Sequence, residues 1–164
     1  MVTLRPARPE DREQLLAVYA STRAEELTPV PWTEEQKSAF VKMQFDAQDA
    51  DYSRNYVGAD FSVVEVDGTP AGRLSVERRP AEVRLIDIAL LPAFRRAGIG
   101  TRLIEELIVE ASSRGVPLTI HVELFNPARR LYERLGFVPV EEHGVHLLME
   151  RRPMAVEAAG VRVS

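Results

Sequence analysis

The spacing of apolar and polar positions in the first part of the chain predicts one strand followed by two helices. Residues 2–5 alternate like a short strand, and residues 9–11 then begin a helix whose apolar positions have helical spacing. A second helix begins after Thr33, because Thr33 and Gln36 have the spacing of a capping box. The chain therefore starts with a strand and two helices.

The rest of the chain predicts six more strands and two more helices. Residues 61–66 and 71–76 are strand-like and flank Asp67-Gly68, a dipeptide that tolerates the positive φ of a tight turn, so they predict a hairpin. Residues 82–90 are unusually apolar toward their end, which is typical of a central strand covered on both faces. The remaining predicted elements are a helix with apolar positions at 103, 104, 107, 108 and 111, a strand at 118–124, a short helix at 127–135, and strands at 137–142 and 145–150.

This order of elements predicts the fold class. Strand, helix and strand through residues 82–124 imply a parallel crossover, whereas residues 61–90 imply an antiparallel meander. We expect an α/β fold with a mixed, mostly antiparallel central sheet of six to seven strands and helices on both faces. A chain of 164 residues suits one domain. We place that domain at residues 1–152 and expect residues 153–164 to form a flexible C-terminal tail.

Composition narrows the classes of function. Lys and Arg number 21 against 25 Asp and Glu, so the net charge of −4 gives no electrostatic case for binding nucleic acid. The chain has no cysteine, which excludes disulfides, thiolate metal sites and a cysteine nucleophile. His143 and His146 lack the carboxylate spacing of a metal site, and we expect surface histidines and no metal. We also expect a cytoplasmic protein with no membrane partner, because no signal peptide and no 18-residue apolar stretch is present.

Residues 95–101, here called the glycine turn, lie between a predicted strand and a predicted helix. Free backbone N–H groups and the helix dipole favour an anion at such a position. Gly98 and Gly100 allow close approach to the backbone, and Arg95 and Arg96 add positive charge, so a diphosphate fits better than a lone carboxylate. The alternative is an ordinary turn that needs glycine for its dihedrals. The spacing matches neither a dinucleotide fold nor a P-loop, which disfavours a nucleotide hydrolase.

Two blocks of sequence carry a resemblance to a known family. Arg95-Arg96-Ala97-Gly98-Ile99-Gly100 satisfies the pattern Arg or Gln, two residues, Gly, one residue, Gly or Ala. Residues 126–137 are similar to a second pattern, Asn followed by Leu-Tyr-Glu, two residues and Gly-Phe. Over roughly residues 70–140 the chain resembles the GNAT superfamily of N-acyltransferases, which use acyl-coenzyme A.

The resemblance implies acetyl-coenzyme A as co-substrate and a set of residues that hold it. In the family the pantetheine arm bonds to the end of the fourth strand, and amides of the glycine turn hold the diphosphate. The coenzyme-binding residues implied here are Ile88, Ala89, Leu90, Arg95, Arg96, Ala97, Gly98, Ile99, Gly100, Thr101 and Asn126. Asn126 also fits a helix N-cap with Pro127 at the first helical position, and the two roles are compatible.

The resemblance also implies catalytic roles, each with a structural alternative. Tyr132 matches the tyrosine that protonates the departing coenzyme A thiolate in many members; the alternative is a ring packed inward from an amphipathic helix. The attacking amine must lose a proton, so a base or a water relay is required. His121 and Glu123 share one face of their strand, with His121 the first candidate base and Glu123 the reserve. Their alternative is a polar side chain on the less buried face.

Four residues are candidates for binding the acceptor. Glu25, Glu26 and Trp32 lie where the family usually builds its acceptor pocket. Asp87 interrupts the apolar run of a central strand, where a carboxylate needs a partner, so it either faces the acceptor cleft or pairs with an arginine.

Taken together, the sequence predicts an N-acetyltransferase that moves an acetyl group from acetyl-coenzyme A to a primary amine by direct attack in a ternary complex. The acceptor is a small molecule or a protein or peptide, and the motifs do not decide between them. The alternative is a non-catalytic module that binds or senses acyl-coenzyme A. Members of the family often pair through their later strands, so a homodimer is one open option for assembly.

Overall fold

The computed structural model describes residues 1–154, and their elements follow the predicted order. The strands are β1 (Val2–Pro6), β2 (Asp60–Val66), β3 (Thr69–Arg78), β4 (Val83–Leu90), β5 (Leu118–Glu123), β6 (Val138–His143) and β7 (His146–Arg151). The helices are α1 (Arg12–Leu27), α2 (Glu34–Asn55), α3 (Ile99–Ser113) and α4 (Arg129–Arg134), with short 3-10 helices η1 (Pro9–Asp11) and η2 (Pro92–Phe94).

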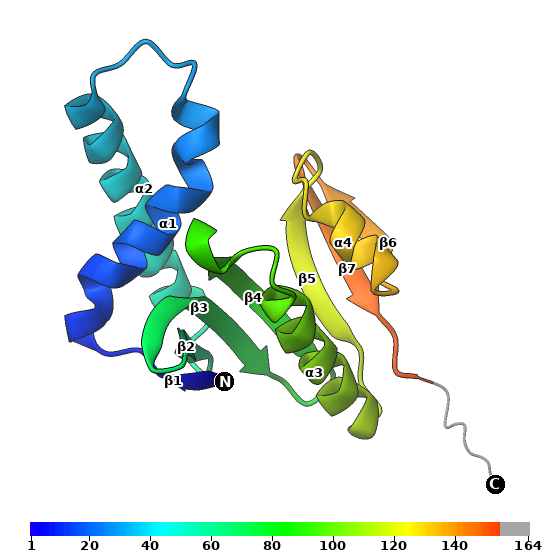
Figure 1. Ribbon diagram of the computed structural model, residues 1–164. Coiled ribbons are helices and arrows are strands. Elements are labelled where there is room, and N and C mark those ends of the chain that lie inside the picture. The colour runs from blue at the N-terminus through cyan, green and yellow to red at the C-terminus, as the bar shows by residue number, and fades with distance from the viewer. Residues whose placement is uncertain (155–164) are drawn as a thin grey trace, which may run out of the picture. The chain divides into compact units, whose positions relative to one another are not determined.

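The sheet of the described chain has seven strands in the order β1-β2-β3-β4-β5-β7-β6 (Figure 1). The pairs β1–β2, β5–β7 and β6–β7 are antiparallel, whereas β4 and β5 are parallel from Val83↔Leu118 to Leu85↔Ile120. The predicted mixed, mostly antiparallel sheet is therefore confirmed. The central position predicted for residues 82–90 is also confirmed, because β4 is the fourth strand.

The chain divides into two compact units. Unit 1 comprises Met1–Ser75 and Asp87–Gly100, and unit 2 comprises Val76–Ile86 and the chain from Thr101 onward. β3 and β4 each contribute residues to both units. The single domain at residues 1–152 stays a prediction. Of the tail predicted at 153–164, residues 155–164 lie outside the described residues.

In unit 1, α1 and α2 pack together through an aromatic contact (Figure 1). Tyr19 and Phe45 are buried with Val41, and the two ring centroids are 5.8 Å apart. The predicted capping box begins α2: Thr33 Oγ1 accepts from Gln36 N at 3.1 Å, and Gln36 Oε1 accepts from Thr33 N at 2.9 Å. Such a cap contributes about 1 kcal/mol to helix stability.

In unit 2, the apolar positions of α3 and β5 face the core as predicted. The buried residues of α3 are Leu103, Ile104, Leu107, Ile108 and Ala111. In β5, Ile120 and Val122 are buried, whereas His121 and Glu123 are exposed. The alternation predicted for this strand is confirmed.

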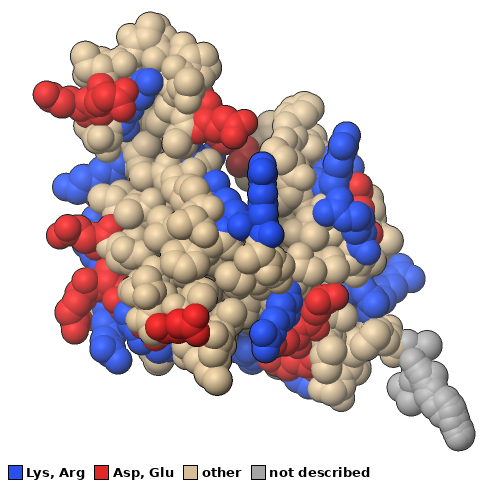
Figure 2. Space-filling view, viewed as in Figure 1, with Lys and Arg blue, Asp and Glu red and all other residues tan. Residues whose placement is uncertain are grey.

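Charged side chains of both signs are interspersed over the surface. Figure 2 shows Lys and Arg beside Asp and Glu across the face in view. Many of them pair, as Arg78 does with Glu110 at 2.6 Å. Within residues 1–154, no helix has both the length and the apolar composition needed to cross a membrane.

Within unit 1, β3 approaches the end of β4 very closely at Gly72. A Cβ atom at this position would lie 2.1 Å from the Ala89 carbonyl oxygen and 3.0 Å from Leu90 Cα. Leu91 N donates to Ala71 O at 2.8 Å beside this contact. Only glycine leaves room for this arrangement, because the opposing atoms belong to backbone.

We predict that Gly72→Ala destabilises the protein by about 1–3 kcal/mol, because β4 must shift to admit the methyl group. Thermal unfolding followed by circular dichroism measures the change. Gly100→Ala is the matched control: the nearest atom to its added Cβ is Leu90 Cδ1 at 3.9 Å. Alanine is favoured over glycine in a helix by about 1 kcal/mol, so this variant should melt at or above the wild-type temperature. Equal melting of wild type and Gly72→Ala would contradict the close approach.

Candidate active site

The glycine turn follows η2 and leads directly into α3. Arg96 and Gly98 both have left-handed backbone conformations, with φ of 64° and 78°. A non-glycine residue at such φ is uncommon and marks a constrained turn. A Cβ atom at Gly98 would meet no atom of residues 1–154 within 4 Å, so this side of the turn is open in the described part of the chain. The first N–H groups of α3 have no intrahelical partner, and an anion at the turn can accept hydrogen bonds from them.

The two arginines of the turn have different surroundings. Arg95 Nε donates to Leu90 O at 2.8 Å, and Arg95 Nη2 donates to Ser21 Oγ at 3.1 Å. Arg95 therefore ties the turn to the end of β4 and to α1. Arg96 is exposed, so its charge is available to a ligand. From the sequence, both arginines were expected to add positive charge for a ligand. The two partners of Arg95 are brought near it only by the fold, so this difference could not be predicted.

The segment Ile88 to Leu90, to which the resemblance assigns the pantetheine arm, is half-buried. The pairing of β4 with β5 runs from Val83 to Leu85, so this segment lies beyond the paired stretch. Its backbone is positioned on the other side by the contact of Ala89 with Gly72.

Asp87 forms the ion pair that was one of its two predicted roles. Arg73 Nε lies 2.7 Å from Asp87 Oδ2. Burial raises the pKa of Asp87 above its ordinary value, while the charge of Arg73 opposes that shift. Its role at the acceptor cleft stays a prediction.

His121 and Glu123 lie on the exposed face of β5, and the strand register adds two histidines beside them. His121 is opposite Leu148, Glu123 is opposite His146, and His146 is opposite His143. All three histidines of the chain thus come to neighbouring positions of one sheet, here called the histidine face. Within residues 1–154, no three His, Asp or Glu residues are grouped so that they could hold a metal ion.

The environment of His121 favours its neutral form. Partial burial lowers the pKa of His121 first, and the positive charge of Arg84 lowers it further. His146 and His143 act in the same direction when protonated, whereas Glu82 opposes them. A neutral imidazole at neutral pH is what a general base requires.

Tyr132 packs its ring inward, as its structural alternative predicted. The residue is 5% exposed, and its ring meets that of Phe137 edge to face with centroids 5.6 Å apart. This packing fixes the position of the phenol. Its role as a proton donor stays a prediction.

The start of α4 corrects one detail of the sequence interpretation. Pro127 was expected at the first helical position, but α4 begins at Arg129. The Asn126 side chain accepts from Ala128 N at 2.8 Å and closes a turn over Pro127 and Ala128 before the helix begins. Asn126 is exposed, and its predicted contact with the coenzyme is untested.

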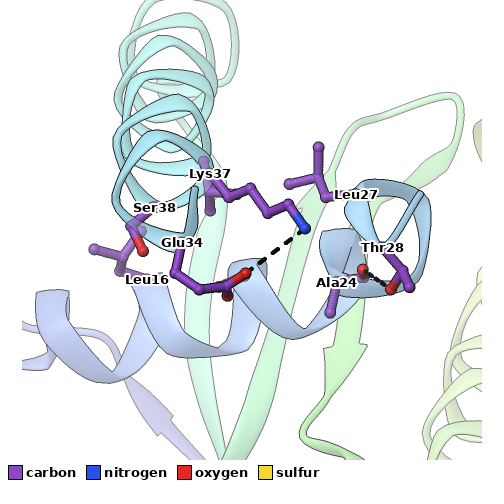
Figure 3. Close-up of a pocket in the computed structure, with 9 residues that line it drawn as sticks. Leu16, Ala24, Leu27, Thr28, Glu34, Lys37 and Ser38 are labelled. Carbon is purple, nitrogen blue, oxygen red and sulfur yellow. Dashed lines mark hydrogen bonds and ion pairs between the residues drawn. The ribbon is translucent and has the colours of Figure 1, made fainter. Parts of the chain in front are cut away.

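A cavity of about 500 Å³ lies between α1 and α2 in unit 1 (Figure 3). Its apolar wall includes Leu16, Leu27 and Val41. Its polar residues include Glu34 and Lys37, whose charged atoms are 3.7 Å apart. The sequence did not single out this pair, although opposite charges three residues apart in the first turn of a helix are a recognisable signal.

The residues predicted to bind the acceptor near these helices lie outside the lining of this cavity. Glu25 is exposed, and Glu26 pairs with Arg23 at 3.2 Å. Trp32 packs edge to face on Phe40 with centroids 5.2 Å apart. Their role in binding the acceptor stays a prediction.

The amino-acid sequence of this chain matches the model of a known family. Residues 20–137 match the model of the acetyltransferase (GNAT) family. The chain therefore belongs to this family, and the resemblance seen in its two sequence blocks is confirmed.

Two curated relatives are named [ribosomal protein bS18]-alanine N-acetyltransferase. The protein from Haemophilus influenzae is 39% identical over 61 residues, which are 37% of this chain and 42% of the relative. The protein from Salmonella typhimurium is 47% identical over 58 residues, which are 34% of this chain and 39% of the relative. The matches thus span about two fifths of these relatives.

Solved structures agree on the fold. PaiA N-acetyltransferase from Thermoplasma acidophilum, in complex with coenzyme A, superimposes with a TM-score of 0.69 at 18% identity, covering 93% of this chain and 99% of that one. The predicted fold class is confirmed by this match.

We predict that substitution of the two arginines of the glycine turn has different effects: loss of Arg96 weakens coenzyme A binding, whereas loss of Arg95 lowers stability. Arg96→Ala should weaken coenzyme A binding roughly tenfold, the effect of losing about 1.4 kcal/mol from a charged contact, and should leave thermal stability unchanged. Arg95→Ala should lower stability by about 1 kcal/mol, because it removes the bonds to Leu90 and Ser21. Calorimetric titration and thermal melts measure the two effects. Equal loss of affinity without loss of stability in Arg95→Ala would contradict this division.

Proposed function

We propose that the protein transfers an acetyl group from acetyl-coenzyme A to a primary amine by direct attack in a ternary complex. The observation that carries the proposal is the glycine turn: it is open at Gly98, has Arg96 in a left-handed conformation, and lies in a chain of the GNAT family. Family membership also supports acetyl-coenzyme A as co-substrate. The named activity of the relatives favours catalysis over the alternative of a coenzyme sensor.

The residues of unit 1 suit the diphosphate and pantetheine of the coenzyme. The amides of the glycine turn and the Arg96 guanidinium would hold the diphosphate. The half-buried backbone of residues 88–90 would bond to the pantetheine arm. Asn126, a residue of unit 2, stays a predicted coenzyme contact. The thioester supplies the activated acetyl group.

Two residues of unit 2 would move protons. An N-terminal ammonium has a pKa of about 7.7–8.0, so the acceptor must lose a proton before it attacks. His121, whose pKa is lowered by burial and by Arg84, would accept that proton, with Glu123 as the reserve base. Tyr132 would donate a proton to the departing thiolate. The chain has no cysteine, and we expect no acyl-enzyme.

We infer that the acceptor is the N-terminal amine of a protein. The inference rests on the two relatives, which are named for the alanine of ribosomal protein bS18. The histidine face also carries Glu123 and Glu141, and carboxylates attract an ammonium group. This acceptor class fits a cytoplasmic protein. Independence of nucleic acid and membranes, and homodimer formation, stay predictions.

An acceptor panel tests the proposed function. The purified chain is incubated with acetyl-coenzyme A and peptides that begin with alanine, with the same peptides blocked at the N-terminus, and with small amines. Release of coenzyme A thiol and the mass of the products are measured. We expect acetylation of the free peptides only. Binding of acetyl-coenzyme A without turnover on any amine, even at raised pH, would support the sensor alternative instead.

We predict that Tyr132→Phe lowers kcat by about 10²-fold, the lower end of the usual contribution of a general acid. Affinity for acetyl-coenzyme A should not change, because phenylalanine keeps the ring packing on Phe137. Tyr19→Phe, also a buried tyrosine, is the matched control and should keep wild-type kcat. Undiminished kcat in Tyr132→Phe would exclude its role as proton donor.

We predict that kcat/KM rises with pH as His121 loses its proton, at a pH below the ordinary histidine value of about 6.5. The rate rises with pH because only the neutral imidazole of His121 can accept a proton. Its lowered pKa moves this rise to lower pH. His121→Gln should abolish this rise and lower kcat/KM at neutral pH by about 10²-fold. Glu123→Gln should keep the rise. The reverse result would make Glu123 the base.

A further inference from the structure

A second cavity, of about 400 Å³, lies in unit 1 and contains none of the residues assigned to the acetyl donor. Its walls come from three places: the connection from β1 to α1 together with the first turn of α1, the second half of α2, and the neighbouring strands β2 and β3. Residues 7–15 of this lining precede residue 20, where the match to the family model begins. The cavity is therefore partly built from sequence outside the family match. We call it the arginine cavity, after Arg8, Arg12 and Arg73 in its lining.

The walls of the arginine cavity combine aromatic surface with positive charge. Phe45, Tyr52 and Phe61 supply the aromatic surface, and the rings of Tyr52 and Phe61 stack at 6.3 Å with an interplanar angle of 19°. Asp49 is the acidic residue of the lining. Binding sites for small molecules have volumes of about 300–1,000 Å³ and mostly apolar walls with a few polar groups, which this cavity matches.

Arg73 is the buried cation of this cavity. It is 8% exposed, and its guanidinium lies over the Tyr52 ring at 5.7 Å from the centroid. Its Nε edge faces Asp87 at 2.7 Å. A guanidinium has five N–H donors, and the described residues accept no further hydrogen bond from this one. The terminal N–H groups are therefore available to an acceptor inside the cavity.

The other two arginines stand nearer the surface. Arg12 pairs with Asp46, and its guanidinium lies over the Phe45 ring at 5.3 Å from the centroid. Arg8 is exposed and has no ion-pair partner within residues 1–154. Three arginines thus line the cavity with one aspartate, in a chain whose net charge is −4. Because Asp46 and Asp87 offset the charges of Arg12 and Arg73, the donors left for an anion are the Arg8 guanidinium and the terminal N–H groups of Arg73.

The wall formed by the connection from β1 to α1 is held in place by Arg5. Arg5 Nη2 lies 2.8 Å from Asp11 Oδ1, and Arg5 Nε lies 2.8 Å from Glu65 Oε2. Hydrogen bonds from Arg5 and from the Arg8 backbone lower the pKa of Asp11 to about 2. Asp11 therefore keeps its charge, and its pairing with Arg5, to a lower pH than an ordinary aspartate would.

We propose that the arginine cavity binds a small carboxylate with an aromatic or apolar body. The carboxylate accepts hydrogen bonds from Arg73 and Arg8, and the body lies against Tyr52 and the neighbouring rings. The Tyr52 hydroxyl is a further group of the lining that can donate a hydrogen bond. A planar carboxylate suits the fork of a guanidinium, and a largely apolar enclosure disfavours a phosphate dianion. The ligand is a second one, distinct from acetyl-coenzyme A and from the amine.

The test is a titration of the full ¹⁵N-labelled chain followed by amide chemical shifts. The probes are phenylacetate, L-phenylalanine, and 2-phenylethanol, which has the same body without the charge. We expect saturable shifts in residues 7–15, 45–53 and 61–75, and affinity for phenylacetate at least tenfold above that for 2-phenylethanol. Tighter binding of L-phenylalanine also supports the site and identifies an amino acid, with Asp49 facing its ammonium group. Added coenzyme A should not displace phenylacetate.

Substitutions of the cavity arginines test whether phenylacetate binds in the arginine cavity. Arg73→Gln should weaken phenylacetate binding at least tenfold. Because this change also leaves Asp87 without its partner, Arg8→Gln is the second variant, and it should weaken binding severalfold without altering thermal stability. Arg102→Gln on α3 makes the same change of charge at an exposed residue paired with Glu106 and should have no effect. No saturable binding to wild type, equal affinity for 2-phenylethanol, displacement by coenzyme A, or unchanged binding in both cavity variants would each overturn the proposal.

Discussion

The contact between Gly72 and the Ala89 carbonyl positions the part of unit 1 on which the proposed chemistry depends. The two backbones meet so closely that a single methyl group would displace one of them. Leu91 N, bonded to Ala71 O, and Arg95, bonded to Leu90 O, extend the same attachment along the chain into the glycine turn. The end of β4 and the turn that follows are thus held from the β3 side. Backbone donors can serve as a preformed anion site only when the chain that carries them is held in this way.

The order of helices and strands could be predicted from the sequence because it depends mainly on local signals. The capping box at Thr33, the apolar stripe of α3 and the alternation at His121 and Glu123 each depend on residues within a few positions of one another. The glycine turn and the block at 126–137 were recognisable for the same reason. The prediction was wrong at the start of α4, where a helix-start signal at Pro127 competes with a turn signal at Asn126. The Asn126 side chain closes a turn, so α4 begins at Arg129, two residues after the proline.

Features that join distant segments could not be predicted. Arg95 reaches Ser21 across 74 positions, and Arg73 meets Asp87 from another strand. Both cavities are lined by residues whose proximity follows from tertiary packing. The spacing of Glu34 and Lys37 indicates an ion pair but no cavity, and nothing local marks Arg73 as a cavity residue. Asp87 was different, because a carboxylate in an apolar strand indicates a partner even when the partner is unknown.

Helix α1 takes part in three features at once. Ser21 holds Arg95 of the glycine turn, Ala20 and Ala24 line the cavity shared with α2, and Arg12 and Leu15 line the arginine cavity. This has a consequence for protein engineering. A library that randomises the whole helix to reshape the cavity shared with α2 would also change the support of the glycine turn, so the two effects would be confounded in any screen. Diversity confined to positions 20 and 24, with an oxygen-bearing side chain kept at position 21, separates them.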